Sequence, residues 1–199
     1  AVHMDDVTKR ACRISHLHVA QNGVVEDRDA TLWVEHNEAA YLEVFRTKDR
    51  QWVLMSSNTK DTSEVRVVRC NIGVGNPVTP VSPRRLLAPR IGVEYFAEHR
   101  DGIFYVISNH ERADFAVYQL PESMLDAEDG GWQHLQPFFT PPGGLHVTDA
   151  DILKHWLVLY GHEAAGPRVC AVPLGGQGGG GCAAAAPARA PYLAALPHA

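Results

Sequence analysis

The sequence predicts an all-β protein, a partial β-propeller of roughly three to four four-stranded blades. Short apolar or alternating runs lie between turn residues along most of the chain, which is typical of β-strands. Three of these runs, 52–56, 104–108 and 156–160, also recur at a constant spacing of 52 residues without a gap. A repeat of about 40–50 residues built from strands is typical of a propeller blade, which needs a neighbour on each face.

Strand-like runs follow one another through the first 174 residues. They occupy residues 10–17, 31–35, 41–46, 51–57, 64–71, 84–88, 93–98, 103–109, 115–120, 133–139, 146–150, 155–160 and 168–173. Polar turns separate them, and Asp101-Gly102 is the clearest, because both central residues of a type I′ turn need positive φ. A short helix is expected near 121–128, where Pro121 can occupy the first helical position and acidic residues follow.

The repeat sorts these runs into blades. The first complete blade takes 41–46, 51–57, 64–71 and 84–88, the second takes 93–98, 103–109, 115–120 and 133–139, and the third takes only 146–150, 155–160 and 168–173. Residues 1–40 look like the outer strands of a preceding, truncated blade. The blades that repeat every 52 residues are therefore expected to extend over 41–174.

The last part of the chain, residues 175–199, has a different composition. Gly175 to Gly181 is nearly all Gly, Cys182 to Ala186 is nearly all Ala, and Pro recurs beyond. Such a Gly/Ala/Pro-rich segment cannot bury enough apolar area to offset its ordering entropy. We therefore expect a disordered, low-complexity tail.

Composition restricts the partners and the setting. The 199 residues carry a formal net charge of −5 with neutral His, which argues against nucleic acid and acidic membranes as partners. No apolar run approaches the ~20 residues that cross a bilayer, and residues 1–10 lack the apolar core of a secretory signal. The four cysteines lie far apart without a Cys-x-x-Cys pair, so a reduced, cytoplasmic setting is expected.

Short motifs occur in a fixed order through the two complete blades. The first blade reads Phe-Arg-Thr-Lys-Asp-Arg at 45–50, Ser-Ser-Asn-Thr-Lys at 56–60 and Thr-Ser-Glu-Val at 62–65. The second reads Val-Glu-Tyr-Phe at 93–96 and Glu-His-Arg-Asp at 98–101, followed by Tyr105 and Ser108-Asn109. Together they resemble the propeller of the prolyl oligopeptidase family of serine peptidases, and the prolyl endopeptidase-like and oligopeptidase B branches most. The resemblance covers about residues 8–174.

The resemblance implies a fold and a role. The family's seven-bladed propeller caps an α/β-hydrolase domain, which holds the catalytic serine, aspartate and histidine, and it limits access to short peptides or other small substrates. This chain has no Gly-x-Ser-x-Gly elbow, the turn that exposes the nucleophile of such a hydrolase, so no catalytic residue is carried over. We expect the non-catalytic propeller portion of a prolyl endopeptidase-like serine hydrolase, inactive alone, whose partner is the hydrolase domain of a longer chain.

Two other interpretations remain open at this point. The chain could be a stand-alone propeller fragment that acts as a protein-interaction module, or a truncated product with no function of its own. An incomplete array leaves unpaired strand edges and an uncovered blade face, which favour self-association.

Histidines are the first candidates for chemistry. His16 and His18 alternate on one strand face and could ligate one ion, but no third ligand stands at metal spacing, so surface histidines are the simpler interpretation. His99 is expected to pair with Glu98 or Asp101 rather than to act as a catalytic base. We predict no catalytic, metal or cofactor-binding residue and no cofactor.

Other patterns also favour structural interpretations. Trp52, Phe104 and Trp156 occupy one repeat position, which favours packing between blades over a ligand groove. A Ser-His-Asp triad can be assembled on paper from this sequence, but without an elbow or an oxyanion hole no arrangement for catalysis supports it. The Gly-x-Gly-x-x-Gly match at 176–181 precedes an Ala run that Pro187 ends, and no second βα unit follows, so a dinucleotide site is not expected.

Three arginines complete the candidates. Arg84, Arg85 and Arg90 could line the tunnel of the propeller and meet acidic peptides. A solvated loop is the simpler interpretation.

Overall fold

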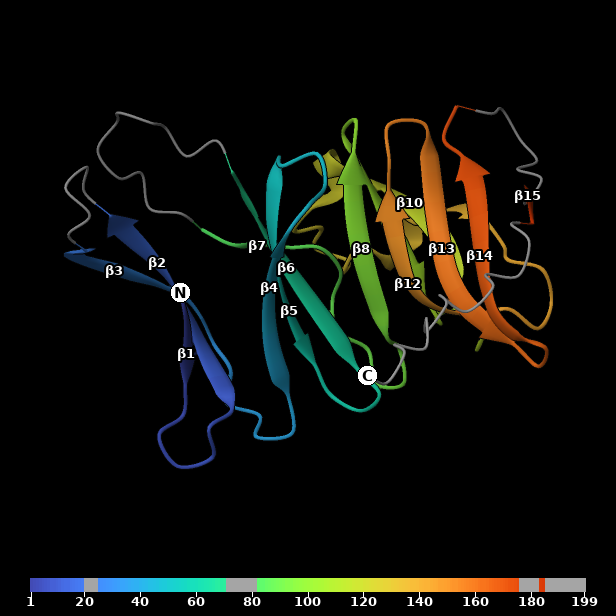
Figure 1. The fold of residues 1–199 in the computed structure, drawn as a ribbon. Coiled ribbons are helices and arrows are strands. Elements are labelled where there is room, and N and C mark those ends of the chain that lie inside the picture. Colours follow the sequence, from blue (N-terminus) through green and yellow to red (C-terminus); the bar gives the residue numbers. More distant parts are fainter. Residues whose placement is uncertain (20–24, 71–81, 176–182, 185–199) are drawn as a thin grey trace, which may run out of the picture.

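The computed structural model describes residues 1–19, 25–70, 82–175 and 183–184; the side chains of residues 18–29 and 183–184 lie outside this description. Four antiparallel sheets stand side by side like blades of a fan (Figure 1). The predicted all-β, partial propeller is confirmed. The helices of the described residues are two short 3-10 turns, η1 Glu122–Met124 and η2 Trp132–His134, and neither could cross a bilayer.

Each blade is a meander in which consecutive strands pair. Blade 1 contains β1 Val2–Met4, β2 Ala11–Val19 and β3 Val25–Val34, and blade 2 contains β4 Tyr41–Arg46, β5 Trp52–Asn58, β6 Ser63–Arg69 and β7 Arg84–Arg85. Blade 3 contains β8 Tyr95–Arg100, β9 Ile103–Ser108, β10 Ala116–Pro121 and β11 Gln136–Phe139, and blade 4 contains β12 His146–Ile152, β13 Trp156–Glu163, β14 Gly166–Pro173 and β15 Ala183–Ala184.

Blades 1 and 4 contain strands that the sequence did not indicate. β1 was not expected, and β3 begins at Val25, six residues before the expected run. Ala183 and Ala184, in the predicted tail, pair with Cys170 and Ala171 of β14. The rest of the predicted tail beyond residue 175, including the Gly-rich motif, lies outside the described residues.

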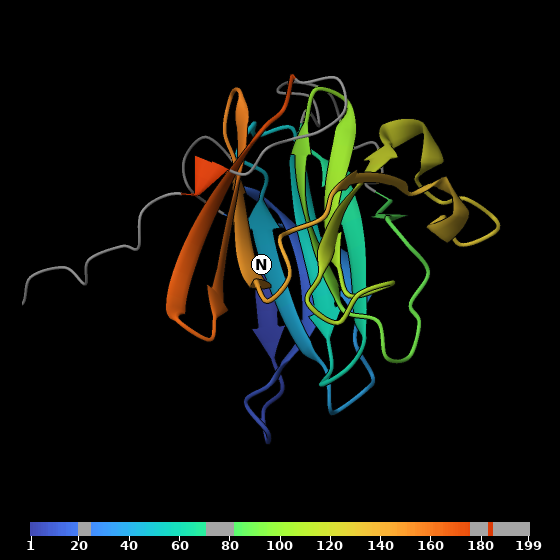
Figure 2. The same cartoon turned by 90° about the vertical axis from the view of Figure 1, so that its right-hand side faces the viewer.

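Of the two local predictions at strand ends, the turn at Asp101-Gly102 is confirmed and the helix over 121–128 is shorter than expected. Asp101 and Gly102 have φ angles of 51° and 80°, and Arg100 pairs with Ile103, so the two-residue turn is present as predicted. The helix expected over 121–128 shortens to η1, because Pro121 still belongs to β10 and Leu125 is already extended. The segment with η1 and η2 projects from the array in Figure 2.

The strand order places β4, β8 and β12 at one edge of their sheets. β8 also contacts β12, and β4 contacts strands β1 and β2 of blade 1, so these edges converge as they do around a propeller axis. We call this side of the array the inner edge. β7, β11 and β15 lie at the opposite, outer edge of their blades.

Apolar side chains from both faces of the middle blades fill the space between blades. Along β9, Phe104 and Val106 join a cluster with blade 2, while Tyr105 and Ile107 join one with blade 4. This alternation follows from the two-residue period of a strand. It leaves β9 buried on both faces, as a central strand between two blades must be.

The gap-free spacing of 52 residues does not align equivalent positions at blade 3. Trp52 of blade 2 faces blade 3, but Phe104 faces back toward blade 2, and the two rings meet at 5.4 Å between centroids. The side chains of blade 4 that face blade 3 are Leu157 and Leu159, so Trp156 again faces away from the preceding blade. A one-residue offset in blade 3 turns its side chains to the opposite face.

Trp156 is therefore an exception to the predicted packing of the aromatic positions. Trp52 and Phe104 are 3% and 0% exposed, whereas Trp156 is 44% exposed. Its face of blade 4 meets no further blade within the described residues. The expectation that all three rings are buried between blades is correct for two of them and wrong for Trp156.

Candidate functional site

A buried histidine joins blades 2 and 3 close to the inner edge. His99 of β8 is fully buried, and its Nδ1 lies 2.6 Å from Oδ2 of Asp49, in the turn after β4. Its Nε2 lies 2.9 Å from Oε1 of Glu122 in η1, an ion-pair contact without hydrogen-bond alignment. The expected partners Glu98 and Asp101 are wrong, because β8 directs His99 toward blade 2.

Other groups hold the two carboxylates in place. Oε1 of Glu122 accepts a hydrogen bond from Nε1 of Trp52 at 3.1 Å, and Oε2 pairs with the guanidinium of Arg69. Burial by itself would raise the pKa of Asp49. The backbone N–H of Gln51, the Thr47 hydroxyl and His99 outweigh burial, so the pKa of Asp49 lies below its ordinary value. We call His99, Asp49 and Glu122 the inter-blade clasp.

A second polar group lies on the opposite face of β8. Glu98 is 8% exposed, and its Oε2 accepts one long hydrogen bond, 3.4 Å from the backbone N–H of Lys48. The Lys48 side chain passes on to blade 4, where Nζ pairs with Oδ1 of Asp151 at 2.7 Å. Oδ2 of Asp151 accepts a hydrogen bond from Tyr160 at 3.2 Å. The Lys48–Asp151 pair thus connects blades 2 and 4 across blade 3.

These side chains border a cavity of about 340 Å³, which we call the inner-edge cavity. Its walls come from the inner strands of three blades and from the turn after β4: Phe45, Arg46, Lys48, Phe96, Ala97, Glu98, Asp149, Ala150 and Asp151. Burial raises the pKa of Glu98 to about 7; the N–H and ammonium of Lys48 oppose this, while Asp151 adds to it. The pKa of Asp151 lies below its ordinary value, because Lys48 donates a hydrogen bond to it.

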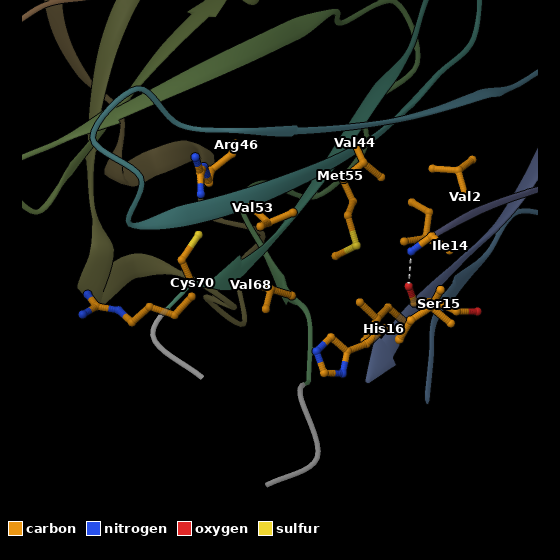
Figure 3. A pocket seen from close by; sticks show the side chains of 14 residues that line it. Val2, Ile14, Ser15, His16, Val44, Arg46, Val53, Met55, Val68 and Cys70 are labelled. Carbon is orange, nitrogen blue, oxygen red and sulfur yellow. Dashed lines mark hydrogen bonds between the residues drawn. The ribbon is translucent and has the colours of Figure 1, made fainter. Parts of the chain in front are cut away.

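A larger cavity of about 530 Å³ lies between blades 1 and 2 (Figure 3). Val44, Val53, Met55 and Val68 of blade 2 face Val2, Ile14 and His16 of blade 1, and Arg46 and Cys70 stand at one end. Five buried apolar residues form the cluster at this junction, against fifteen between blades 2 and 3, so the space is less completely filled. Its lining is mainly apolar and includes the titratable side chains of His16, Arg46, Arg69 and Cys70.

The histidines and cysteines considered as metal ligands are not grouped into a site within the described residues. His16 lines the blade 1–2 cavity, while the side chain of His18 lies outside the described residues. Within the part of the chain that the structure describes, no group of three or more His, Cys, Asp or Glu side chains is arranged to hold a metal ion. Cys12 and Cys70 are free and half-buried.

The three arginines do not reach the inner edge. Arg84 and Arg85 form β7 at the outer edge, where the Arg84 guanidinium pairs with Asp126 at 2.8 Å. The Arg90 guanidinium lies over the ring of Trp132, 4.7 Å from its centroid. A role in lining the tunnel is therefore wrong for all three, and they stabilise outer turns.

Five serines, Ser15, Ser56, Ser57, Ser63 and Ser108, are buried within the sheets, whereas Ser82 and Ser123 are exposed. Ser108 donates a hydrogen bond to the carbonyl oxygen of Glu94 at 3.0 Å, and Ser56 accepts one from Asn58 at 3.3 Å. Among the hydrogen bonds of the described residues, none joins a Ser hydroxyl to a His ring. These serines complete the polar ends of strands β5 and β9.

Comparison with known proteins gives partial matches. No protein-family model matches the chain. Prolyl endopeptidase-like proteins of Xenopus laevis and Homo sapiens are 28% and 27% identical over 149 and 135 residues, which are 72% and 67% of this chain. The chain spans only 19% and 17% of the length of these relatives.

Solved structures share the fold. Oligopeptidase B from Trypanosoma brucei, with covalently bound antipain, superposes with a TM-score of 0.70 at 19% identity, over 87% of this chain and 23% of the enzyme. Oligopeptidase B from Leishmania major gives 0.67 at 18% identity, over 86% and 22%. The predicted resemblance to the propeller of this group of peptidases is confirmed for part of the chain.

Proposed function

We propose that this chain is the non-catalytic propeller portion of a prolyl endopeptidase-like serine hydrolase. Its role would be to limit the access of short peptides to an α/β-hydrolase domain in a longer chain. The observation that carries the proposal is the agreement between a blade array and relatives of which this chain matches only about a fifth. A propeller cap acts by excluding large substrates, and this needs no catalytic group of its own.

The internal structure of the array supports a rigid cap. The His99–Asp49 contact of the inter-blade clasp joins blades 2 and 3, and the Lys48–Asp151 pair joins blades 2 and 4. Interactions of this kind hold the blades at a fixed angle and so fix the width of the opening between their inner strands. The proposal therefore places the gate at β4, β8 and β12.

The test is the dependence of hydrolysis on peptide length. A longer protein that contains these blades should cleave short peptides and exclude long ones, and a version without residues 41–174 should lose that discrimination. Matched ester substrates, which are small enough to enter either form, report whether the hydrolase domain itself is intact. An unchanged length dependence after removal of the blades, with ester turnover retained, would overturn the proposed role.

Exposed apolar residues give specific support to a protein-interaction module as the second candidate. Trp156 and Leu153 on blade 4, and Val2, Met4 and Val34 on blade 1, are each at least 43% exposed. Apolar side chains at both ends of an array favour contact with another protein surface. A pull-down with wild-type chain and a Trp156→Ser variant tests this, and equal capture by both would argue against blade 4 as the contact surface.

A further inference from the structure

The inner-edge cavity contains a buried acid without a full set of partners. Oε2 of Glu98 accepts a long hydrogen bond, 3.4 Å, from the backbone N–H of Lys48, and the backbone N–H of His99 also acts on the carboxyl group. The nearest ammonium group, that of Lys48, is 2.7 Å from Asp151 instead. A buried carboxylate normally pairs with a cation, and among the described residues Glu98, which lines the cavity, has backbone donors but no ion pair.

The lining of the cavity carries more acidic than basic side chains. Its lining carries three carboxyl groups, from Glu98, Asp149 and Asp151, and two cationic side chains, from Arg46 and Lys48. One negative charge therefore remains uncompensated when all three acids are ionised. A single positive charge would balance it.

The rest of the lining suits an organic cation. The side chains of Phe45 and Phe96 lie in the wall, and aromatic faces attract ammonium and guanidinium groups. A volume of about 340 Å³ lies at the lower end of the range for small-molecule pockets. In the described part of the chain no set of ligands for a metal ion is present, here or elsewhere.

We propose that the inner-edge cavity binds one organic monocation, an ammonium or guanidinium group, through the carboxylate of Glu98. The group could belong to a basic side chain or to the amino terminus of a peptide, which share this chemistry. The site is a property of these blades alone. It therefore goes beyond the proposed function and does not depend on a hydrolase domain.

Binding would be linked to loss of a proton. With a pKa of about 7, Glu98 is largely protonated in slightly acidic solution. The incoming cation favours the carboxylate, so the carboxyl O–H bond breaks, the proton passes to solvent and an ion pair forms with Glu98. Among the charged groups that line the cavity with Glu98, Lys48 lowers the pKa of Glu98 and Asp151 raises it, and Arg46 and Asp149 also lie in the lining. Binding should strengthen as the pH rises through 7.

The test uses the purified chain and three probes in calorimetric and NMR titrations. N-acetyl-arginine amide carries only a guanidinium, alanine amide carries only an α-ammonium, and N-acetyl-citrulline amide is a neutral analogue of the first. We expect one or both cations to bind saturably and the neutral analogue to bind at least about tenfold more weakly. The stronger of the two cations identifies the source of the group.

Variants show whether Glu98 carries the binding. Glu98→Gln should weaken binding of the cation about tenfold or more and abolish proton release, while Glu43→Gln, the same change on the exposed face of β4, should change neither. Asp149→Asn, which keeps Glu98 but removes one charge of the lining, should weaken binding by a smaller factor and gives a second test should the first variant fail to fold. No binding of either cation, equal binding of the neutral analogue, or an unchanged affinity in the Glu98 and Asp149 variants would overturn the proposal.

Discussion

The buried carboxyl group of Glu98 makes the stability of the chain depend on pH in an unusual direction. In the folded chain its pKa is raised from 4.5 to about 7, mainly by burial. Folding therefore retains a proton on Glu98 that the unfolded chain has already lost above pH 4.5. This contribution to stability is fully present below the unfolded pKa and declines as the pH rises through the folded pKa.

The structure sets the size of this effect. The interval from 4.5 to about 7, at about 1.4 kcal/mol per pH unit, corresponds to a loss of up to about 3 kcal/mol in the free energy of unfolding. Glu98→Gln keeps the shape of the protonated side chain and cannot ionise. We therefore expect the variant to match the wild-type chain near pH 4.5 and to be the more stable of the two by up to about 3 kcal/mol above pH 7.

Urea unfolding, followed by tryptophan fluorescence from pH 4.5 to above pH 7, measures the difference between the two proteins. Titrations elsewhere in the chain cancel in this difference. Glu43→Gln, an exposed change of the same kind on β4, is the control and should give a constant difference. The burial argument would be refuted if the difference in the free energy of unfolding between Glu98→Gln and the wild-type chain stayed constant. It would also be refuted if the wild-type chain became the more stable of the two as the pH rises.

Three further predictions concern the packing between blades and the association of the array. Trp52→Ala should destabilise the chain by about 3–5 kcal/mol in urea unfolding, and Trp156→Ala by less than about 0.5 kcal/mol; similar values for both would contradict the assigned faces. His99→Ala should cost about 3–5 kcal/mol, because Asp49 and Glu122 lose their shared partner, and a cost below about 1 kcal/mol would show that the clasp is not stabilising. Light scattering should show association that increases with concentration, since both ends of the array expose apolar side chains, and a monomer at high concentration would argue against it.

Much of the fold could be predicted from local patterns. Strands β4, β5, β8 and β9 follow from short apolar runs between polar turns, and Asp101-Gly102 defines its hairpin through positive φ. The repeat could be seen in the sequence, but the alignment without gaps did not reveal the one-residue offset at blade 3. Such an offset changes little in the sequence pattern of β9, because both of its faces are buried and it is apolar at nearly every position.

The polar groups of the inner edge could not be predicted in the same way. His99 pairs with Asp49, 50 residues earlier, and with a carboxylate in η1, so its partners depend on how two blades pack. Sequence neighbours suggested Glu98 instead, yet adjacent residues of a strand point to opposite faces. For Glu98 the available signal was an acid in an otherwise buried strand, which indicates an unusual environment.

The non-catalytic nature of the chain is the central claim that can be tested most directly. Purified chain is incubated with a serine-reactive fluorophosphonate probe and with short peptide and ester substrates, beside an active serine hydrolase as the positive control. Hydrolysis requires a positioned nucleophile, a base and an oxyanion site, so we predict neither labelling nor turnover. Labelling or turnover that disappears in a Ser56→Ala, Ser63→Ala or Ser108→Ala variant would contradict the account.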